Sequence, residues 1–135
     1  MGVYENKILI KTYKESGRTS EMLPLLFSKI CDEFKIQNIY FANGPGSFMA
    51  IKVTYVFLQT MRISLGIDIF AADGFEFNRN APIRAMKKVY FVKEKGKIMT
   101  RRFDYNIENQ FELPPFLQPE RFTKNCDPLY VLPAV

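Results

Sequence analysis

The sequence contains no histidine and no tryptophan among its 135 residues. Without histidine it lacks the commonest general base, the serine–histidine triad and the usual ligand of catalytic zinc. Its two cysteines, Cys31 and Cys126, are far apart and form no CxxC pair, so they predict buried free thiols rather than a structural metal site. We therefore expect no catalytic constellation of the peptidase kind, no metal and no cofactor.

The sequence also lacks a targeting signal and a convincing membrane span. Residues 1–14 alternate charged and apolar side chains, unlike the apolar core of a signal peptide. The apolar stretch 48–70 is interrupted by Lys52, Arg62 and Asp68, which would make a membrane-spanning helix costly. The expectation is a cytoplasmic protein that does not bind membranes.

What the chain has in quantity is apolar and aromatic side chains and positive charge. The hydrophobic fraction is 47%, aromatics make up 15%, and the net charge is +5. This composition supports a packed core and argues against disorder. The length allows one domain, or one domain and a fragment.

The most informative motif is Gly44-Pro45-Gly46-Ser47-Phe48, which follows an apolar run ending at Ala42. Glycine tolerates positive φ and proline fixes its own φ, so this order predicts a strand, a tight turn and a helix capped by Ser47. Bare amides at a helix N-terminus can bind an anion, which makes Gly44, Gly46 and Ser47 candidate anion or nucleotide-binding residues. A plain strand-to-helix connection is the alternative. The spacing matches neither a dinucleotide fingerprint nor a P-loop.

Hydrophobic periodicity predicts an α/β arrangement. A first part, residues 1–75, is expected to hold a hairpin over 3–13, strands at 36–42 and 67–71, and two helices. The first helix runs from Thr19 or Ser20, one of which would cap it, to about Phe34; the second runs from Ser47 to Leu65 and ends at Gly66. A reduced second part, residues 76–135, is expected to hold a hairpin over 88–103 and a proline-rich tail.

An apolar stripe on the first helix is expected to form the core. Its members are Leu23, Phe27, Ile30 and Phe34. We expect the stripe to pack on strands that contain Ile8, Ile10, Ile39 and Phe41.

The second helix is apolar on nearly all sides, more than so small a domain can easily bury. An exposed apolar surface marks a binding site for a partner, unless the second part covers it. The candidate interface residues are Met22, Leu25 and Lys29 on the first helix and Lys52, Tyr55, Leu58, Gln59 and Arg62 on the second. The expected central anchors are Tyr55 and Leu58 on the second helix and Met22 and Leu25 on the first, and Lys52 and Arg62 should lie toward the rim.

Two other patterns have functional and plain interpretations. The carboxylates Asp68, Asp73 and Glu76 could hold Mg²⁺, or belong to an ordinary polar loop. Basic residues interleaved with Tyr90, Phe91 and Phe103 could bind RNA, or form the solvated face of a hairpin. The candidate RNA contacts are Arg84, Lys87, Lys88, Arg101 and Arg102.

The segment Ala42–Lys52 resembles the GRGPGSFTGxR motif of the TsaB (YeaZ) family, bacterial proteins of tRNA threonylcarbamoyladenosine synthesis. Three weaker segments follow the family order: Thr19–Pro24 resembles HSExLLP, Arg84–Tyr90 resembles the strand DARxGEVY, and Asp127–Val131 resembles PxYLR. The chain departs from the family pattern in its short length, in having Lys52 for arginine and Arg84 for aspartate, and in lacking the usual first strand, LaIDTS.

This resemblance implies an actin/hexokinase-like, ribonuclease-H-like half domain with two packed helices. It implies a non-catalytic scaffold that forms a homodimer and pairs with the catalytic subunit TsaD and the ATPase TsaE, contacting tRNA through that complex. Direct RNA binding by the basic hairpin, and a hydrolase related to the older glycoprotease annotation of the family, are the alternatives.

Overall fold

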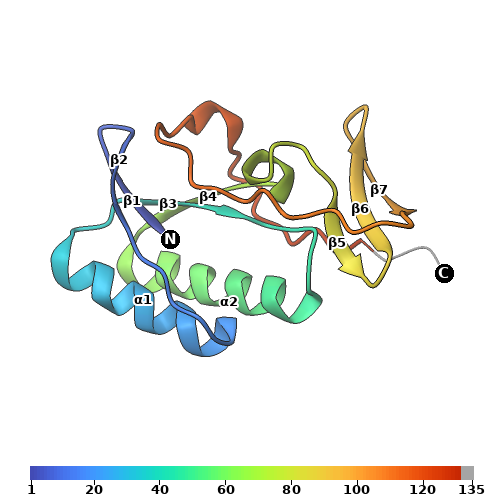
Figure 1. The fold of residues 1–135 in the computed structure, drawn as a ribbon. Coiled ribbons are helices and arrows are strands. Elements are labelled where there is room, and N and C mark those ends of the chain that lie inside the picture. Colours follow the sequence, from blue (N-terminus) through green and yellow to red (C-terminus); the bar gives the residue numbers. More distant parts are fainter. Residues whose placement is uncertain (132–135) are drawn as a thin grey trace.

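The computed structural model describes residues 1–131 and has a mixed α/β fold (Figure 1). The strands are β1 (Gly2–Glu5), β2 (Ile8–Thr12), β3 (Asn38–Ala42), β4 (Asp68–Ala72), β5 (Ile83–Met86), β6 (Val89–Glu94) and β7 (Lys97–Arg102). The helices are α1 (Thr19–Glu33) and α2 (Phe48–Leu65), with short 3-10 helices η1 (Gly74–Phe77) and η2 (Pro119–Arg121). Residues 132–135 of the expected second part lie outside the described residues.

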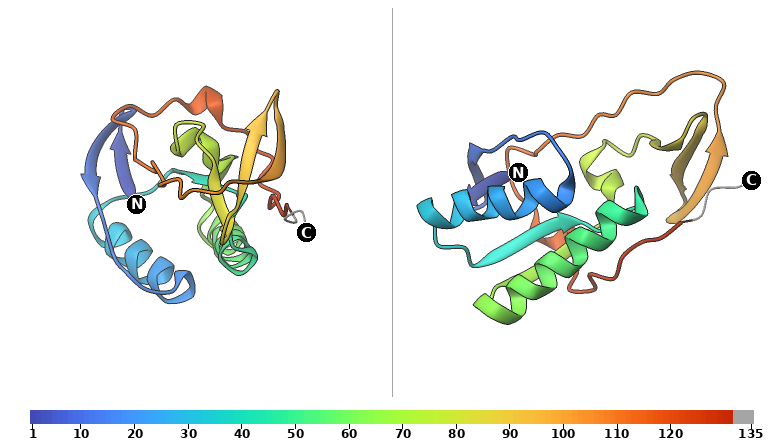
Figure 2. Two further views of the ribbon diagram at one scale, coloured as in Figure 1. Left: turned by 45° about the vertical axis from the view of Figure 1, so that its right-hand side comes forward. Right: turned by 90° about the horizontal axis from the view of Figure 1, so that it is seen from below.

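The strands form three separate small sheets. β1 pairs with β2 antiparallel, β3 pairs with β4 parallel, and β5, β6 and β7 form an antiparallel sheet in that order. Both long helices lie side by side on the same side of β3 and β4, as the view from below shows (Figure 2). The expected order of hairpin, helix, strand, helix and strand is thus present.

The ends of α2 follow the local chemistry predicted for them. The Ser47 hydroxyl accepts a hydrogen bond from the amide of Ala50 at 3.5 Å, and Gly66 ends the helix with a left-handed φ of 66°. In α1 the predicted cap is wrong. Arg18 occupies the capping position without a side-chain bond, because Thr19 and Ser20 already lie within the first helical turn.

The core stripe of α1 is confirmed for Leu23, Phe27 and Ile30, which are all buried. The Phe27 ring packs edge-to-face on Phe57 of α2, with 5.5 Å between ring centroids. Phe34 is only half-buried, because it follows the helix with an extended backbone. One position off the predicted stripe, Leu26, is buried as well.

The predicted strand partners of that stripe are partly wrong. Ile39 and Phe41 of β3 pack at the core, but Ile8 and Ile10 of β2 are 50% and 45% exposed. The hairpin of β1 and β2 forms its own sheet and is not joined to β3, so Ile8 and Ile10 are not held under α1.

The two cysteines differ in environment. Cys126 is buried, and its thiol lies 3.6 Å from the carbonyl oxygen of Ile69 in β4. Burial raises the pKa of this thiol above its usual value. Cys31 is exposed on α1, so the prediction of two buried thiols holds only for Cys126.

A second buried cluster joins η1 to the sheet of β5, β6 and β7, and consists of Phe75, Ile83 and Phe91. The segment 84–90 that resembles a single family strand is divided here into β5 and the start of β6. Lys87 has a φ of 37°, which turns the chain between the two strands.

The C-terminal tail returns along the whole molecule and pairs with both N-terminal sheets. The amide of Leu9 donates to the Pro115 carbonyl at 3.0 Å, and the amide of Leu117 donates to the Lys7 carbonyl at 2.8 Å. Further on, Thr123 exchanges two backbone hydrogen bonds with Ala71 of β4, at 2.8 and 2.9 Å. The tail therefore covers the outer edge of β2 and the outer edge of β4.

Candidate functional site

Helix α2 has a row of exposed apolar side chains on the face turned away from the core. Met49, Val56 and Ile63 are 70%, 55% and 74% exposed. They are seven residues apart, which is almost two helical turns, so they share one face. Thr60 lies on the same face, and its hydroxyl donates to the Val56 carbonyl at 2.8 Å. We call Met49, Val56, Thr60 and Ile63 the α2 seam; it is a helix surface without a partner in the described part of the chain.

The prediction that Leu58 is a central anchor of an exposed interface is wrong. Leu58 is 3% exposed and packs with Ile69, Ala71 and Cys126 in the core. Two residues along an α-helix correspond to a rotation of about 200°, so Leu58 points away from the side on which Val56 lies. Leu58 therefore lies on the inner face of α2.

The other predicted interface residues of α2 occupy one flank of the helix. Lys52 and Arg62 are exposed, while Tyr55 and Gln59 are half-buried. The Gln59 side-chain oxygen accepts a hydrogen bond from Nε of Arg62 at 2.8 Å. Gln59 and Arg62 line a small hollow together with Lys124 and Cys126 of the tail. This flank therefore faces the tail, and the seam lies next to it on the open side.

The predicted interface residues of α1 differ from one another in exposure and in their contacts. Leu25 is 49% exposed, Met22 is half-buried, and the Lys29 ammonium pairs with Glu15 at 2.9 Å. α1 also carries the acidic residues Glu21, Asp32 and Glu33, whereas Lys52 and Arg62 are the charged residues of α2. A hydrogen bond from Lys11 lowers the pKa of the Glu33 carboxyl. The two helices thus present opposite charges.

The glycine turn before α2 is filled by the chain itself. The amide of Leu129 donates to the Asn43 carbonyl, and the amide of Gly74 donates to the Gly44 carbonyl, both at 2.8 Å. Asn43, Gly44 and Pro45 are buried, whereas Gly46 is half-buried and Ser47 is exposed. Gly44 is therefore not accessible to a ligand, and the Ser47 hydroxyl already bonds the helix N-terminus. Gly44, Gly46 and Ser47 therefore do not together form an open anion-binding turn.

Gly44 is required here by geometry, which gives a testable expectation. Its φ is 116°, and a Cβ atom would lie 2.8 Å from the Leu129 carbonyl oxygen. We expect Gly44→Ala to lower the free energy of unfolding by about 2–3 kcal/mol, from backbone strain and displacement of the tail. Urea denaturation measures this, with Gly96→Ala as control, because Gly96 has a φ of 77° and open space around it. Equal losses in the two variants would contradict this account of the turn.

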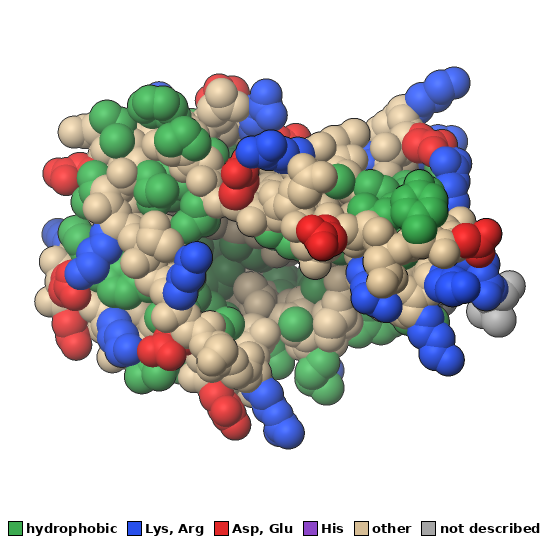
Figure 3. Space-filling model, in the orientation of Figure 1, with side chains coloured by type: hydrophobic (Ala, Val, Ile, Leu, Met, Phe, Trp, Pro, Cys, Tyr) green, Lys and Arg blue, Asp and Glu red, His purple; other side chains and the backbone are tan. Residues whose placement is uncertain are grey.

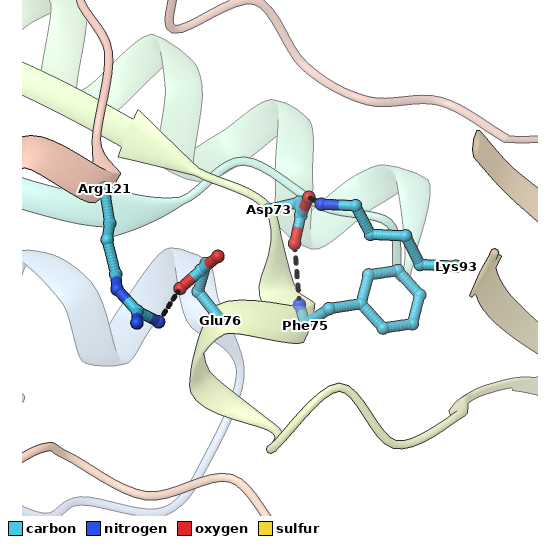
Figure 4. A network of polar contacts seen from close by, with 5 residues as sticks. All are labelled: Asp73, Phe75, Glu76, Lys93 and Arg121. Carbon is cyan, nitrogen blue, oxygen red and sulfur yellow. Dashed lines mark hydrogen bonds and ion pairs between the residues drawn. The ribbon is translucent and has the colours of Figure 1, made fainter. Parts of the chain in front are cut away.

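Two of the acidic residues proposed for Mg²⁺, Asp73 and Glu76, are held in separate ion pairs (Figure 4). Asp73 accepts a hydrogen bond from the Phe75 amide at 3.0 Å and pairs with Lys93 at 2.5 Å. Glu76 pairs with Arg121 at 3.1 Å. Asp68 begins β4 while Asp73 follows its end, about 16 Å away along an extended strand. Within residues 1–131 no three metal-binding side chains gather at one point, and Asp73 and Glu76 are already paired with basic side chains.

The basic hairpin does not present one RNA-binding face. Arg101 and Arg102 are consecutive in β7, so they point to opposite sides of the sheet. Arg101 also pairs with Glu94 at 2.6 Å. Tyr90 and Phe91, expected to stack on bases, are 0% and 2% exposed and belong to the core.

The remaining basic residues of this group lie around the β5–β6 turn. Arg84 is exposed, and its Nε donates to the Lys87 carbonyl at 3.1 Å. Lys87 and Lys88 are exposed in the turn itself. Tyr105, which no sequence pattern marked, is an exposed aromatic residue shortly after β7, and its ring packs on Phe103.

The search of protein-family models and the search of curated proteins found no match to this chain. Neither α1 nor α2, nor any other helix within residues 1–131, combines the length and hydropathy that crossing a bilayer requires.

Proposed function

We propose that this chain is a non-catalytic scaffold that works by pairing with another protein through the α2 seam. The observation that carries the proposal is the row of Met49, Val56 and Ile63, each more than half exposed on one face of a long helix. Apolar side chains repeated every seven residues are the pattern by which helices pack against partner helices. Exposed apolar surface of this kind on a soluble domain marks a protein interface.

We propose further that the setting is that of the TsaB family. The Gly44–Phe48 turn, a capped α2 directly after it, and two packed helices on one side of β3 and β4 support an actin/hexokinase-like half domain. The scaffold would form a homodimer whose surface TsaD takes over, with TsaE joining the complex and tRNA bound through it. The absence of histidine from the whole sequence supports a role without acid–base chemistry of its own.

The charges on the two helices suggest how two copies pair. A two-fold axis would bring α2 of one copy against α1 and α2 of the other in a four-helix packing. Lys52 and Arg62 of α2 would then approach the acidic residues of the partner's α1. Charges at such a rim mainly select the partner and speed association.

The direct test is a charge placed in the middle of the seam. We expect Val56→Glu to convert a dimer into a monomer in sedimentation velocity, because an unpaired carboxylate would be buried in an apolar contact. The matched control is Ile8→Glu, which places the same charge on a similarly exposed apolar residue of β2. This control should sediment like the parent.

Binding of purified TsaD tests the proposed TsaB setting, whereas sedimentation tests pairing through the α2 seam. If the parent chain dimerises and Val56→Glu does not, but neither binds TsaD, the seam is an interface and the TsaB setting is wrong. If Val56→Glu and the parent sediment alike and capture TsaD alike, the seam is not an interface and the scaffold proposal fails.

A further inference from the structure

A cavity of about 920 Å³ separates the two N-terminal sheets. One wall is β1 and the opposite wall is β3, and both strands line it along their whole length. Leu23 and Phe27 of α1 and Thr54 and Leu58 of α2 line it from the helix side. The space-filling view shows a hollow in this face of the molecule, with apolar side chains inside it (Figure 3).

The strand edges that border this cavity are unpaired, while the outer edges are paired. The ladder of β1 runs to β2, and that of β3 runs to β4. The outer edges of β2 and β4 are covered by the tail, at residues 115–117 and at Thr123. Within residues 1–131, no backbone hydrogen bond joins β1 to β3. The order across the molecule is therefore tail, β2, β1, cavity, β3, β4 and tail.

This arrangement specifies the chemistry of an occupant. Unpaired backbone N–H and C=O groups on a strand edge are satisfied by another strand. A small apolar molecule would fill the space but leave both edges without hydrogen bonds, which is costly away from water. An extended peptide satisfies both edges at once. β1 has four residues and β3 has five, so a segment of about five residues, roughly 17 Å long, matches them.

The two faces of the cavity specify the side chains. Leu23, Phe27 and Leu58 line the cavity from the helices, and Leu113 and Phe122 line it from the tail. The charged residues Glu5, Lys7, Glu33 and Lys35 also belong to the lining. A strand inserted here would be covered on both faces, and strands buried on both faces are continuous apolar runs rich in valine and isoleucine.

We propose that this cavity receives an extended, apolar segment of about five residues from a partner protein. The segment inserts as a strand between β1 and β3 and joins the two sheets into one. Addition of a strand to an open sheet edge is an established mode of peptide recognition, and here two edges face the same peptide. The site is separate from the α2 seam, so it stands or falls independently of the proposed function.

The probe is the synthetic peptide acetyl-Lys-Val-Ile-Val-Ala-Val-Lys-amide, whose terminal lysines keep it soluble. Its control has the same side chains, with N-methyl groups on the isoleucine and the following valine. These groups remove one backbone donor toward each neighbouring strand. Loss of two net hydrogen bonds predicts that the control binds at least about tenfold more weakly by calorimetry.

Hydrogen exchange followed by NMR shows where the peptide binds. We expect slower exchange at amides of both β1 and β3 on addition of the parent peptide, and no change in β7. Equal binding of the two peptides, protection confined to one of these strands, or no binding at millimolar peptide would each overturn the proposal. So would full displacement of the peptide by dodecanoate with β1 and β3 amides still exchanging freely, which would mark an apolar ligand site.

A pair of variants on one helix tests the cavity itself. Thr54→Phe adds a ring on the helix side of the cavity and should abolish binding of the peptide. Ser64→Phe adds the same ring at an exposed position of α2 outside both the cavity and the α2 seam, and should leave binding intact. Circular dichroism establishes that each variant is folded. If Thr54→Phe does not fold, the comparison of the two peptides on the parent protein still decides the question.

Discussion

Replacing Phe27 by alanine is expected to lower the free energy of unfolding by about 3–5 kcal/mol, among the largest effects of a single change in this chain. Phe27 is 8% exposed and packs edge-to-face on Phe57. The variant loses the burial of the ring, the aromatic contact and the packing between α1 and α2. Urea denaturation should show the midpoint falling with little change in slope.

The matched control for this change is Phe116→Ala. The Phe116 ring is 62% exposed in the tail, so its removal gives up little buried surface. We expect that variant to stay within about 1 kcal/mol of the parent. A parent-like midpoint for Phe27→Ala would mean that α1 does not pack on α2 in solution.

The second large effect is expected at Asn78, a fully buried polar residue that ties together two distant loops. Its side-chain nitrogen donates to the carbonyls of Ala81 and Pro82 at 3.1 and 3.2 Å, and its oxygen accepts a hydrogen bond from the Gln110 amide at 2.5 Å. Asn78→Leu keeps the branching and the number of side-chain heavy atoms but leaves three backbone groups without this partner. We expect a loss of about 2–4 kcal/mol, limited by water reaching some of these groups.

Asn109→Leu is the control for that experiment, because Asn109 is exposed beside Gln110. Thermal unfolding by circular dichroism compares the two variants. The interpretation predicts a clear drop in the melting temperature for Asn78→Leu and little for Asn109→Leu. If the two curves coincide, the hydrogen bonds of Asn78 contribute no net stability.

The parts of the fold that depend on neighbouring residues were predictable from the sequence. Ser47 and Gly66 act within one helical turn of α2, so their residue types identify its two ends. The turn before that helix could be predicted from two glycines around Pro45 for the same reason. The start of α1 was predicted less accurately. Thr19 and Ser20 both have side chains suited to capping, but Arg18 occupies the N-cap position.

The parts that depend on distant residues were not predictable. Because α2 is apolar on most sides, its sequence does not show which of its side chains face the core. Whether Leu58 is one of them depends on what packs against the helix. The exposure of Ile8 depends on the separation of two sheets, which no local pattern encodes. The α2 seam did have a signal, the seven-residue spacing of Met49, Val56 and Ile63. That signal was hidden by the equally apolar residues between them.

The return of the tail across the molecule has a consequence for synthesis on the ribosome. The Tyr4 hydroxyl donates to the carbonyl of Pro114, 110 residues further along the chain. The outer edge of the hairpin likewise forms its backbone hydrogen bonds with Pro115 and Leu117. Contacts between residues so far apart in sequence form slowly, because a long loop must close first. The N-terminal hairpin therefore emerges from the ribosome long before the segment that completes its sheet, and the outer edge of β2 stays unpaired until residues 114–117 have been synthesised.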